Sequence, residues 1–136
     1  MATELDQETV ELVAQYVECA TYEECRDFLQ KHPNLIDKKV ADSLFENGYM
    51  IWETQPHAIS ARFIRNGQII NYLLDIRKAS GGQQDITLFF YRILEDKAGG
   101  FRKSFEEQCM SILKHVDDSW KRRNAEKAAK KGSTDA

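Results

Sequence analysis

Apolar residues recur at intervals of three and four along most of this chain, which places them on one face of an α-helix. The clearest run lies late in the sequence: Phe101, Phe105, Cys109, Ile112, Leu113, Val116 and Trp120. Only two prolines, Pro33 and Pro56, occur among the 136 residues. Because proline interrupts helices, so few of them favour long helices over a series of short strands. The sequence therefore predicts an all-α fold.

Signals for helix ends divide this pattern into six helices. The first contains the apolar residues from Leu5 to Val17, and the second begins at a capping box formed by Thr21 and Glu24. The second ends at His32, because the residue before a proline is driven out of the helical region. The remaining boundaries are Asp37 as an N-cap, Gln55–Pro56, a fourth helix over residues 57–79, Ser80–Gly81–Gly82, Asp85 as an N-cap, and Gly99–Gly100.

Two glycines lie inside the helical pattern, Gly48 in the third helix and Gly67 in the fourth. Glycine costs about 1 kcal/mol relative to alanine in a helix, so both positions predict the close approach of another element. The run Leu88–Tyr91 also fits a strand, but no segment nearby offers an alternating partner strand. We therefore expect a helix there as well.

The helices and their short loops predict one compact six-helix bundle in residues 1–120. In this interpretation the long C-terminal helix continues into a basic tail, residues 121–136, which frays and ends in disordered chain. Residues 1–24 contain no Lys or Arg, whereas the tail carries Arg122, Arg123, Lys127, Lys130 and Lys131. The formal net charge is only −3, so the overall charge favours neither nucleic acid nor an acidic membrane as a partner.

No arrangement of residues is typical of catalysis, of a metal site or of a bound cofactor. Cys19, Cys25 and Cys109 are odd in number and lack metal-ligand spacing. The three histidines have no second ligand at helical spacing, and no phosphate-binding or nucleophile motif occurs. The chain is thus predicted not to be an enzyme and to need no cofactor. An enzyme whose site is assembled from distant residues stays open as a further hypothesis.

Cysteine usage and hydropathy bear on the location of the protein. Free cysteines beside apolar residues are typical of a reducing compartment. Residues 1–7 lack the basic start and the apolar run of a signal peptide, and no stretch approaches the roughly 18 apolar residues of a membrane span. We expect a cytoplasmic protein.

Three segments share their order and spacing with a known family: Tyr22–Leu35 followed by Tyr49 and Trp52, then Gly67–Ile76, and last Phe89–Ile93 followed by Phe101 and Phe105. In this order the chain resembles the Hsp-ninety/kinase co-chaperones known as cell-division-cycle protein thirty-seven. The likeness covers about residues 13–120 and concerns the central, chaperone-binding domain. It implies an all-helical bundle that docks on the N-terminal ATPase domain of the ninety-kilodalton heat-shock chaperone and arrests its cycle while client kinases load.

The resemblance also implies a contact surface at the end of the first helix and on the early part of the fourth. The matching positions here are Glu18, Thr21, Ala58, Ile59 and Arg62. From the first region the family can place an arginine in the chaperone's nucleotide pocket, where this sequence has Thr21, with Arg26 the only arginine nearby. Kinase clients are expected to bind only through a tryptophan-bearing N-terminal segment that this sequence lacks.

The leading hypothesis is a non-catalytic co-chaperone domain that modulates the chaperone's ATP cycle. Ala58 and Ile59 form a small apolar patch ringed by Arg62 and Arg65, as expected of a modest protein interface. The spacing of Ile59 with Phe63 fits packing inside the bundle equally well. The alternative is a helical adaptor whose basic tail associates with nucleic acid or another protein, with an affinity that falls steeply with salt. Neither hypothesis involves a membrane.

Overall fold

Six α-helices and one short 3₁₀ turn make up the described part of the computed structural model, residues 5–83, 86–95 and 100–134. They are, in order, α1 (Gln7–Tyr16), α2 (Tyr22–Lys31), the 3₁₀ turn η1 (Pro33–Leu35), α3 (Lys38–Met50), α4 (His57–Ala79), α5 (Ile86–Glu95) and α6 (Gly100–Thr134). No strand occurs among these residues, so the predicted all-α fold is confirmed. The predicted boundaries at Asp85 and Gly99 lie outside the described residues.

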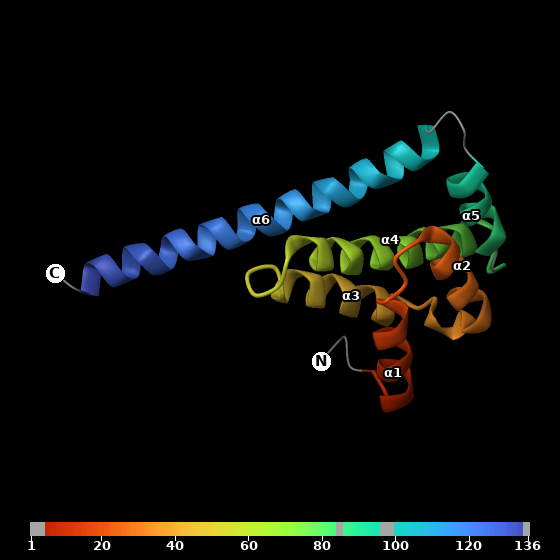
Figure 1. Cartoon of the computed structure of the whole chain (residues 1–136), viewed down its shortest axis with the longest axis horizontal. Coiled ribbons are helices and arrows are strands. Elements are labelled where there is room, and N and C mark those ends of the chain that lie inside the picture. The colour runs from red at the N-terminus through yellow and green to blue at the C-terminus, as the bar shows by residue number, and fades with distance from the viewer. Residues whose placement is uncertain (1–4, 84–85, 96–99, 135–136) are drawn as a thin grey trace.

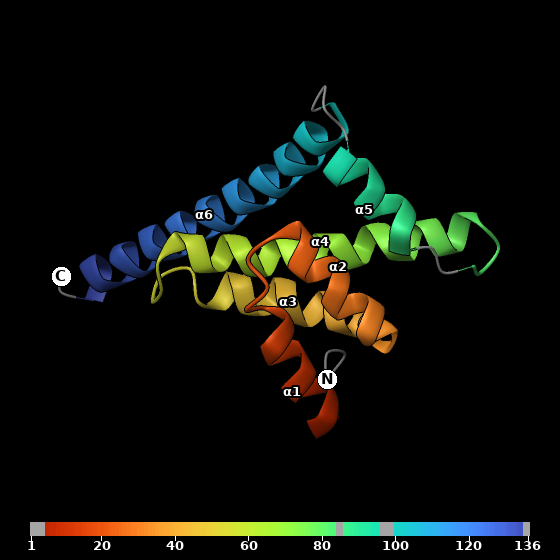
Figure 2. The same ribbon diagram turned by 45° about the vertical axis from the view of Figure 1, so that its right-hand side comes forward.

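α3 and α4 lie side by side and antiparallel at the centre of the molecule (Figure 1). α6 packs across α4 and continues past the turn that joins α3 to α4 (Figure 1). α2 and α5 pack against each other towards the other end of α4, and α1 projects from the bundle (Figure 2). The expected six-helix bundle with a long last helix is therefore confirmed.

The first three helices each have a side-chain N-cap. Those at Thr21 and Asp37 form where the sequence predicts helix starts, whereas Asp6 caps α1, which begins two residues later than the expected start at Leu5. The side chains of Asp6 and Asp37 accept hydrogen bonds from the backbone N–H groups of Thr9 and Lys39, both at 2.8 Å. The Thr21 hydroxyl accepts from the Glu24 N–H at 3.1 Å, but it donates to the Glu24 carboxylate, also at 3.1 Å. The expected capping box is therefore closed between the two side chains and not through the Thr21 backbone.

The short segment between α2 and α3 differs from the predicted linker because it contains η1. Pro33 begins this turn, where its missing N–H costs nothing. The turn carries Leu35 into the core, where it is fully buried. A linker that buries a leucine holds α3 firmly against the first two helices.

The two helical glycines allow α3 and α4 to approach closely, as predicted. A Cβ atom added at Gly48 would lie 2.9 Å from Ile64 Cδ1 and 3.2 Å from Phe63 Cβ. One added at Gly67 would lie 3.2 Å from Leu44 Cβ. Each glycine thus faces a side chain of the opposite helix, and any larger residue would push the helices apart.

Aromatic rings fill the core where α4, α5 and α6 meet. Phe89 lies with its ring centroid 5.3 Å from that of Phe105 and 5.1 Å from that of Phe90. Tyr72 of α4 packs edge-on against Phe105 at 5.7 Å. Because Phe89, Phe90 and Ile93 are all buried on one side of α5, the segment is a helix and not the strand that it also resembles.

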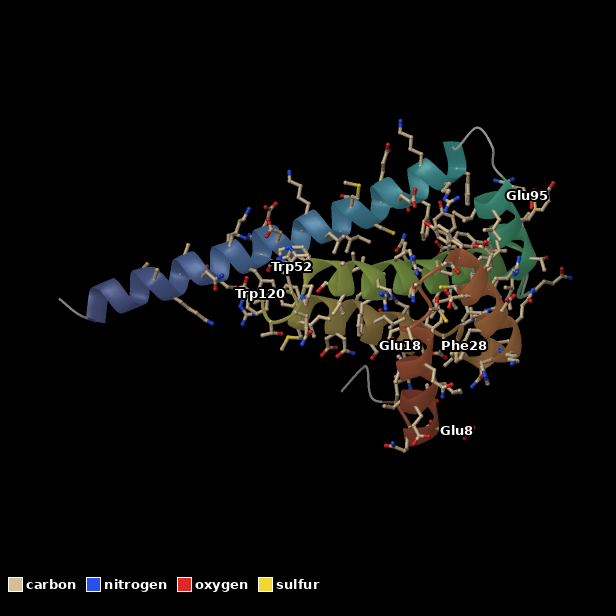
Figure 3. All side chains as sticks on the ribbon, in the orientation of Figure 1. Glu8, Glu18, Phe28, Trp52, Glu95 and Trp120 are labelled. Carbon is tan, nitrogen blue, oxygen red and sulfur yellow. The ribbon has the colours of Figure 1, made fainter. Side chains whose placement is uncertain are left out.

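The middle of α6 is bonded to the turn between α3 and α4, where Figure 3 shows Trp52 and Trp120 close together. Trp52 is buried, and its Nε1 donates to Asp117 at 3.3 Å, while Trp120 Nε1 donates to the Tyr49 carbonyl at 2.8 Å. Asn124 adds a bond of 2.8 Å to Glu53. The division of the chain at residue 120 stays a prediction, and the tail of residues 121–136 lies partly outside the described residues.

We expect Gly48→Ala to lower the free energy of unfolding by about 1 kcal/mol. Crowding in a packed core costs about 1–3 kcal/mol, which outweighs the gain in helix propensity of about 1 kcal/mol. Urea denaturation followed by circular dichroism measures the difference. The control is Gly100→Ala, whose added Cβ meets no atom within 4 Å and should change stability by less than about 0.5 kcal/mol. A more stable Gly48→Ala would contradict the close approach.

Candidate functional site

A buried asparagine in the middle of α4 joins α4 to α1 and α2. Asn66 is fully buried, and its Nδ2 donates to the carbonyl oxygens of Tyr16 at 3.1 Å and Cys19 at 3.3 Å. Its own backbone carbonyl accepts from Tyr16 Oη at 2.8 Å, and its Oδ1 accepts from the Cys25 thiol at 3.4 Å. One amide therefore binds both the end of α1 and the first part of α2.

Arg65, the preceding residue, bonds to the same turn. Its Nη1 donates to the Ala20 carbonyl at 2.8 Å, and its Nη2 donates to the Cys19 carbonyl at 2.9 Å and to Asn66 Oδ1 at 2.9 Å. The guanidinium thus satisfies carbonyls that the end of α1 leaves without helical partners, through charge-assisted bonds. We call this group, made of Tyr16, Cys19, Cys25, Arg65 and Asn66, the Asn66 junction.

The Tyr16 phenol and the Cys25 thiol of the Asn66 junction stay protonated at neutral pH. Burial raises the pKa of the Cys25 thiol to about 12, against a smaller opposing effect of Arg65. Burial likewise raises the pKa of Tyr16 well above its usual value. Both groups therefore act as neutral hydrogen-bond donors. The high thiol pKa also removes Cys25 as a nucleophile, because the reactive form is the thiolate.

α6 holds the start of α2 next to the Asn66 junction. Tyr22 is buried, and its Oη donates to the Glu106 carboxylate on α6 at 3.1 Å. The guanidinium groups of Arg65 and Arg102 lie 5.4 Å and 4.9 Å from the centroid of the Tyr22 ring, within the range of cation–π attraction. Burial, reinforced by the Glu106 charge, raises the pKa of Tyr22. The neutral phenol is therefore a second bridge between α2, α4 and α6.

The five predicted contact residues lie on two parts of the molecule, the turn after α1 and the first turns of α4. Glu18 and Thr21 are exposed on the turn from α1 to α2. Figure 3 shows Glu18 at the end of α1 that lies nearer the other helices, opposite Glu8. On the first turns of α4, Ala58 is exposed while Ile59 and Arg62 are half-buried. The sequence left open whether Ile59 belongs to an exposed apolar patch or packs inside the bundle. Its half-burial lies between the two, since part of the side chain packs and part faces solvent.

The bonds of the Asn66 junction fix how these two groups are related. Arg65 and Asn66 bond to Cys19 and Ala20 in the turn from α1 to α2, so this turn lies against the middle of α4. Arg62 precedes Asn66 by about one turn, or about 6 Å along the axis, and Ala58 precedes it by about 12 Å. That these five residues bind a partner stays a prediction.

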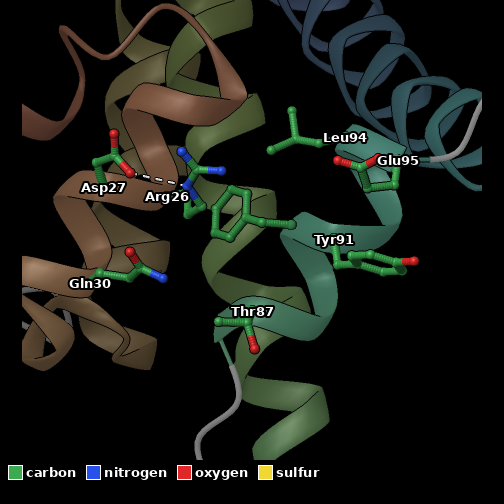
Figure 4. A pocket seen from close by; sticks show the side chains of 8 residues that line it. Arg26, Asp27, Gln30, Thr87, Tyr91, Leu94 and Glu95 are labelled. Carbon is green, nitrogen blue, oxygen red and sulfur yellow. Dashed lines mark hydrogen bonds and ion pairs between the residues drawn. The ribbon is translucent and has the colours of Figure 1, made fainter.

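Arg26 lies away from this pair of regions. It lines a groove of about 410 Å³ between α2 and α5, together with Asp27, Tyr91 and Leu94 (Figure 4). Its Nε donates to the Asp27 carboxylate at 3.0 Å. Arg26, the arginine nearest to Thr21 in the first part of the sequence, is therefore paired with Asp27 on a different face of α2 from Thr21.

The described residues contain no arrangement that indicates a metal site. No group of three or more His, Cys, Asp or Glu side chains within residues 5–83, 86–95 and 100–129 is placed to hold a metal ion. All three cysteines are free and buried, and burial raises the pKa of Cys109 to about 12. Within the described part of the chain, no helix combines the length and the apolar character needed to cross a bilayer.

The described residues thus form an all-helical domain with an exposed turn after α1 and a partly apolar first part of α4. The model of the Cdc37 Hsp90 binding domain matches residues 15–130 of this chain. The chain therefore belongs to the family of Cdc37 Hsp90-binding domains, which are co-chaperone domains that dock on Hsp90 and are generally non-catalytic. No curated protein and no solved structure showed a significant match.

The sequence analysis did not identify Asn66 or Arg65 as the residues that position the site. Asn66 lies between Phe63 and Ile70 on the apolar side of α4, and a polar residue at such a position is the signal that points to a buried hydrogen-bond network. Its partners are two carbonyls, a phenol and a thiol from residues far away in the sequence. Periodicity alone does not reveal them.

We expect Asn66→Ala to lower the free energy of unfolding by about 2–4 kcal/mol, because the variant removes the buried hydrogen bonds of the Asn66 side chain to the Tyr16 and Cys19 carbonyls, the Cys25 thiol and Arg65. Backbone amides of residues 17–21 should also exchange hydrogen faster than in the wild type. The matched control on α4 is Gln68→Ala, which removes one exposed bond to Gln108 of 3.2 Å and should cost less than about 1 kcal/mol. Equal stability and equal exchange for both variants would refute the role of the junction.

Proposed function

We propose that this domain docks on the N-terminal ATPase domain of Hsp90 and slows its ATP turnover while client kinases load. Its contacts are made by Glu18, Thr21, Ala58, Ile59 and Arg62, which we call the docking surface. The observation that carries the proposal is the family match over residues 15–130, a range that contains all five residues. The Asn66 junction supports it, because it fixes the turn that carries Glu18 and Thr21 against α4, the helix that carries the other three residues.

The chemistry of the docking surface suits a modest protein interface. Ala58 and Ile59 supply apolar surface at its centre, and Arg62 and Glu18 supply charges of opposite sign at its rim. A half-buried isoleucine is a rigid anchor, because the bundle already restricts its rotamers and little further entropy is lost on binding. The rim charges then select orientation more than they add affinity.

We propose that the domain slows ATP turnover by occupying the ATPase domain and not by inserting an arginine into the nucleotide pocket. The Thr21 hydroxyl is engaged in capping α2, and its side chain is too short to reach into a partner. Arg26 pairs with Asp27 in the groove between α2 and α5. Neither residue offers a free guanidinium at the end of α1, and Arg62 belongs to α4, so steric hindrance of the chaperone's movements is the simpler mechanism.

We also propose that the domain works in the cytoplasm and that client kinases bind through other segments of the assembly. Three free and buried cysteines fit a reducing compartment.

Titration of the isotope-labelled chain with the Hsp90 ATPase domain tests the proposal directly. We expect chemical-shift changes at Glu18, Thr21 and residues 58–62, and a Kd that calorimetry can measure. Ala58→Asp, Ile59→Asp and Arg62→Glu should each weaken binding by about tenfold, the loss typical of one interface anchor. The exposed position of Ala58 makes its variant informative even if Ile59→Asp proves unstable.

The matched controls place the same new side chains on the exposed side of α6. Met110→Asp matches the two aspartate variants, and Lys114→Glu matches Arg62→Glu, since both residues are exposed in the described structure. Both controls should bind like the wild type. Absence of wild-type binding at several hundred micromolar overturns the function, and normal binding by all three surface variants overturns the choice of residues.

The variant Thr21→Arg tests how ATP turnover is slowed. It costs about 1 kcal/mol through loss of the N-cap, which the bundle tolerates. Because the new guanidinium projects from the docking surface, we expect stronger inhibition of the chaperone's ATPase at saturation than the wild type gives. Glu23→Arg, at an exposed position two residues later, controls for the added charge. Equal inhibition by both variants would show that position 21 does not face the nucleotide pocket.

A further inference from the structure

An apolar groove of about 330 Å³ lies between α1, α3 and α4. Its apolar wall is formed by Val10, Val13 and Val17 of α1 and by Phe63 of α4, and its polar edge by Ser43 and Asn47 of α3. Val10 is 45% exposed, an unusual state for a valine on the inner side of a helix. The groove is therefore apolar surface that the bundle does not cover with its own described side chains.

The groove is continuous with the docking surface. Glu18 belongs to the docking surface and also lines the groove. Phe63 lines it too, and this residue directly follows Arg62 in α4. A partner that covers Glu18 and Arg62 must therefore pass over the mouth of the groove, so the same partner is the one placed to fill it.

The charge beside the groove restricts what fills it. Glu11 is exposed on α1, and Glu18 is exposed just beyond its C-cap residue. Ala14, which lines the groove, is three residues after Glu11 and four before Glu18, so both carboxylates lie towards its side of the helix. Residues 1–24 contain no Lys or Arg, and neither carboxylate forms an ion pair within the described part of the chain. Ser43 and Asn47, on the opposite side of the groove, carry no charge. The Asn47 side-chain amide donates a hydrogen bond to the Ser43 carbonyl at 2.8 Å. An aliphatic side chain beside a lysine or arginine fits this arrangement.

We propose that the groove is a second anchoring point of the Hsp90 complex and receives an aliphatic side chain of the ATPase domain that is flanked by a Lys or Arg. This inference rests on the proposed function. The aliphatic group removes Val10 and Phe63 from water, and the cation pairs with Glu18 and Glu11. Two anchoring points at the ends of one surface fix the orientation of the partner as well as its affinity.

The experiment uses the full chain and the Hsp90 ATPase domain. Ala14 is exposed and lines the groove, so Ala14→Glu places a charged side chain in it without disturbing the core. We expect its Kd to rise by about tenfold. The control is Gln15→Glu, the same new side chain at the next exposed position of α1, which should bind like the wild type. Methyl signals of Val10, Val13 and Val17 should shift when the chaperone domain is added.

The charge is tested by Glu11→Lys, which should weaken binding and reduce its dependence on salt, with Glu8→Lys as the exposed control further round α1. If Ala58→Asp weakens binding while Ala14→Glu and the valine methyl signals stay as in the wild type, the groove inference is overturned and the proposed function stands. If Ala14→Glu weakens binding and Ala58→Asp does not, the result supports the groove as a binding site and overturns the proposed contact at Ala58. A wild type that does not bind overturns both.

Discussion

The hydrogen bonds of Asn66 are the constraint on which the arrangement of the first four helices depends. A primary amide buried in the core is costly unless its donors and its acceptor find partners. Here the partners are the carbonyls of Tyr16 and Cys19, the Cys25 thiol and the Arg65 guanidinium. All but the guanidinium come from the end of α1, the turn after it and the start of α2. The buried polar group therefore favours this placement of the turn, because a different placement leaves these groups without their partners.

The rest of the bundle makes that geometry rigid. Gly48 and Gly67 let α3 approach α4 so closely that neither helix can shift without a clash. Tyr22 connects α2 to α6 through Glu106, and the Trp120 bond to Tyr49 fixes α6 at the far end of α4. A surface built from exposed residues on this frame loses little conformational freedom on binding, so a small interface can suffice.

Local signals in the sequence predict most of the fold, because helices are set by local propensity and periodicity. The fourth helix was expected at residues 57–79, and α4 spans His57–Ala79. The close contacts of Gly48 and Gly67 also follow from the sequence, since glycine inside a helix has a cost that packing must offset. The 3₁₀ turn at Pro33 and the side-chain closure of the Thr21 capping box depend on details that the pattern of residue types does not contain.

The candidate site was harder to predict, because its parts are joined across long stretches of chain. The resemblance implied Glu18, Thr21, Ala58, Ile59 and Arg62, but not the bonds by which Arg65 and Asn66 hold the turn after α1 against α4. In the complex that we propose, the carboxylates of Glu11 and Glu18 act at long range and govern how fast a cationic partner arrives and in which orientation. The apolar groove and Ile59 act there only on contact, so they govern how long the partner stays. A domain whose partner must later leave benefits from this separation, because a change in charge can alter arrival without rebuilding the apolar contact.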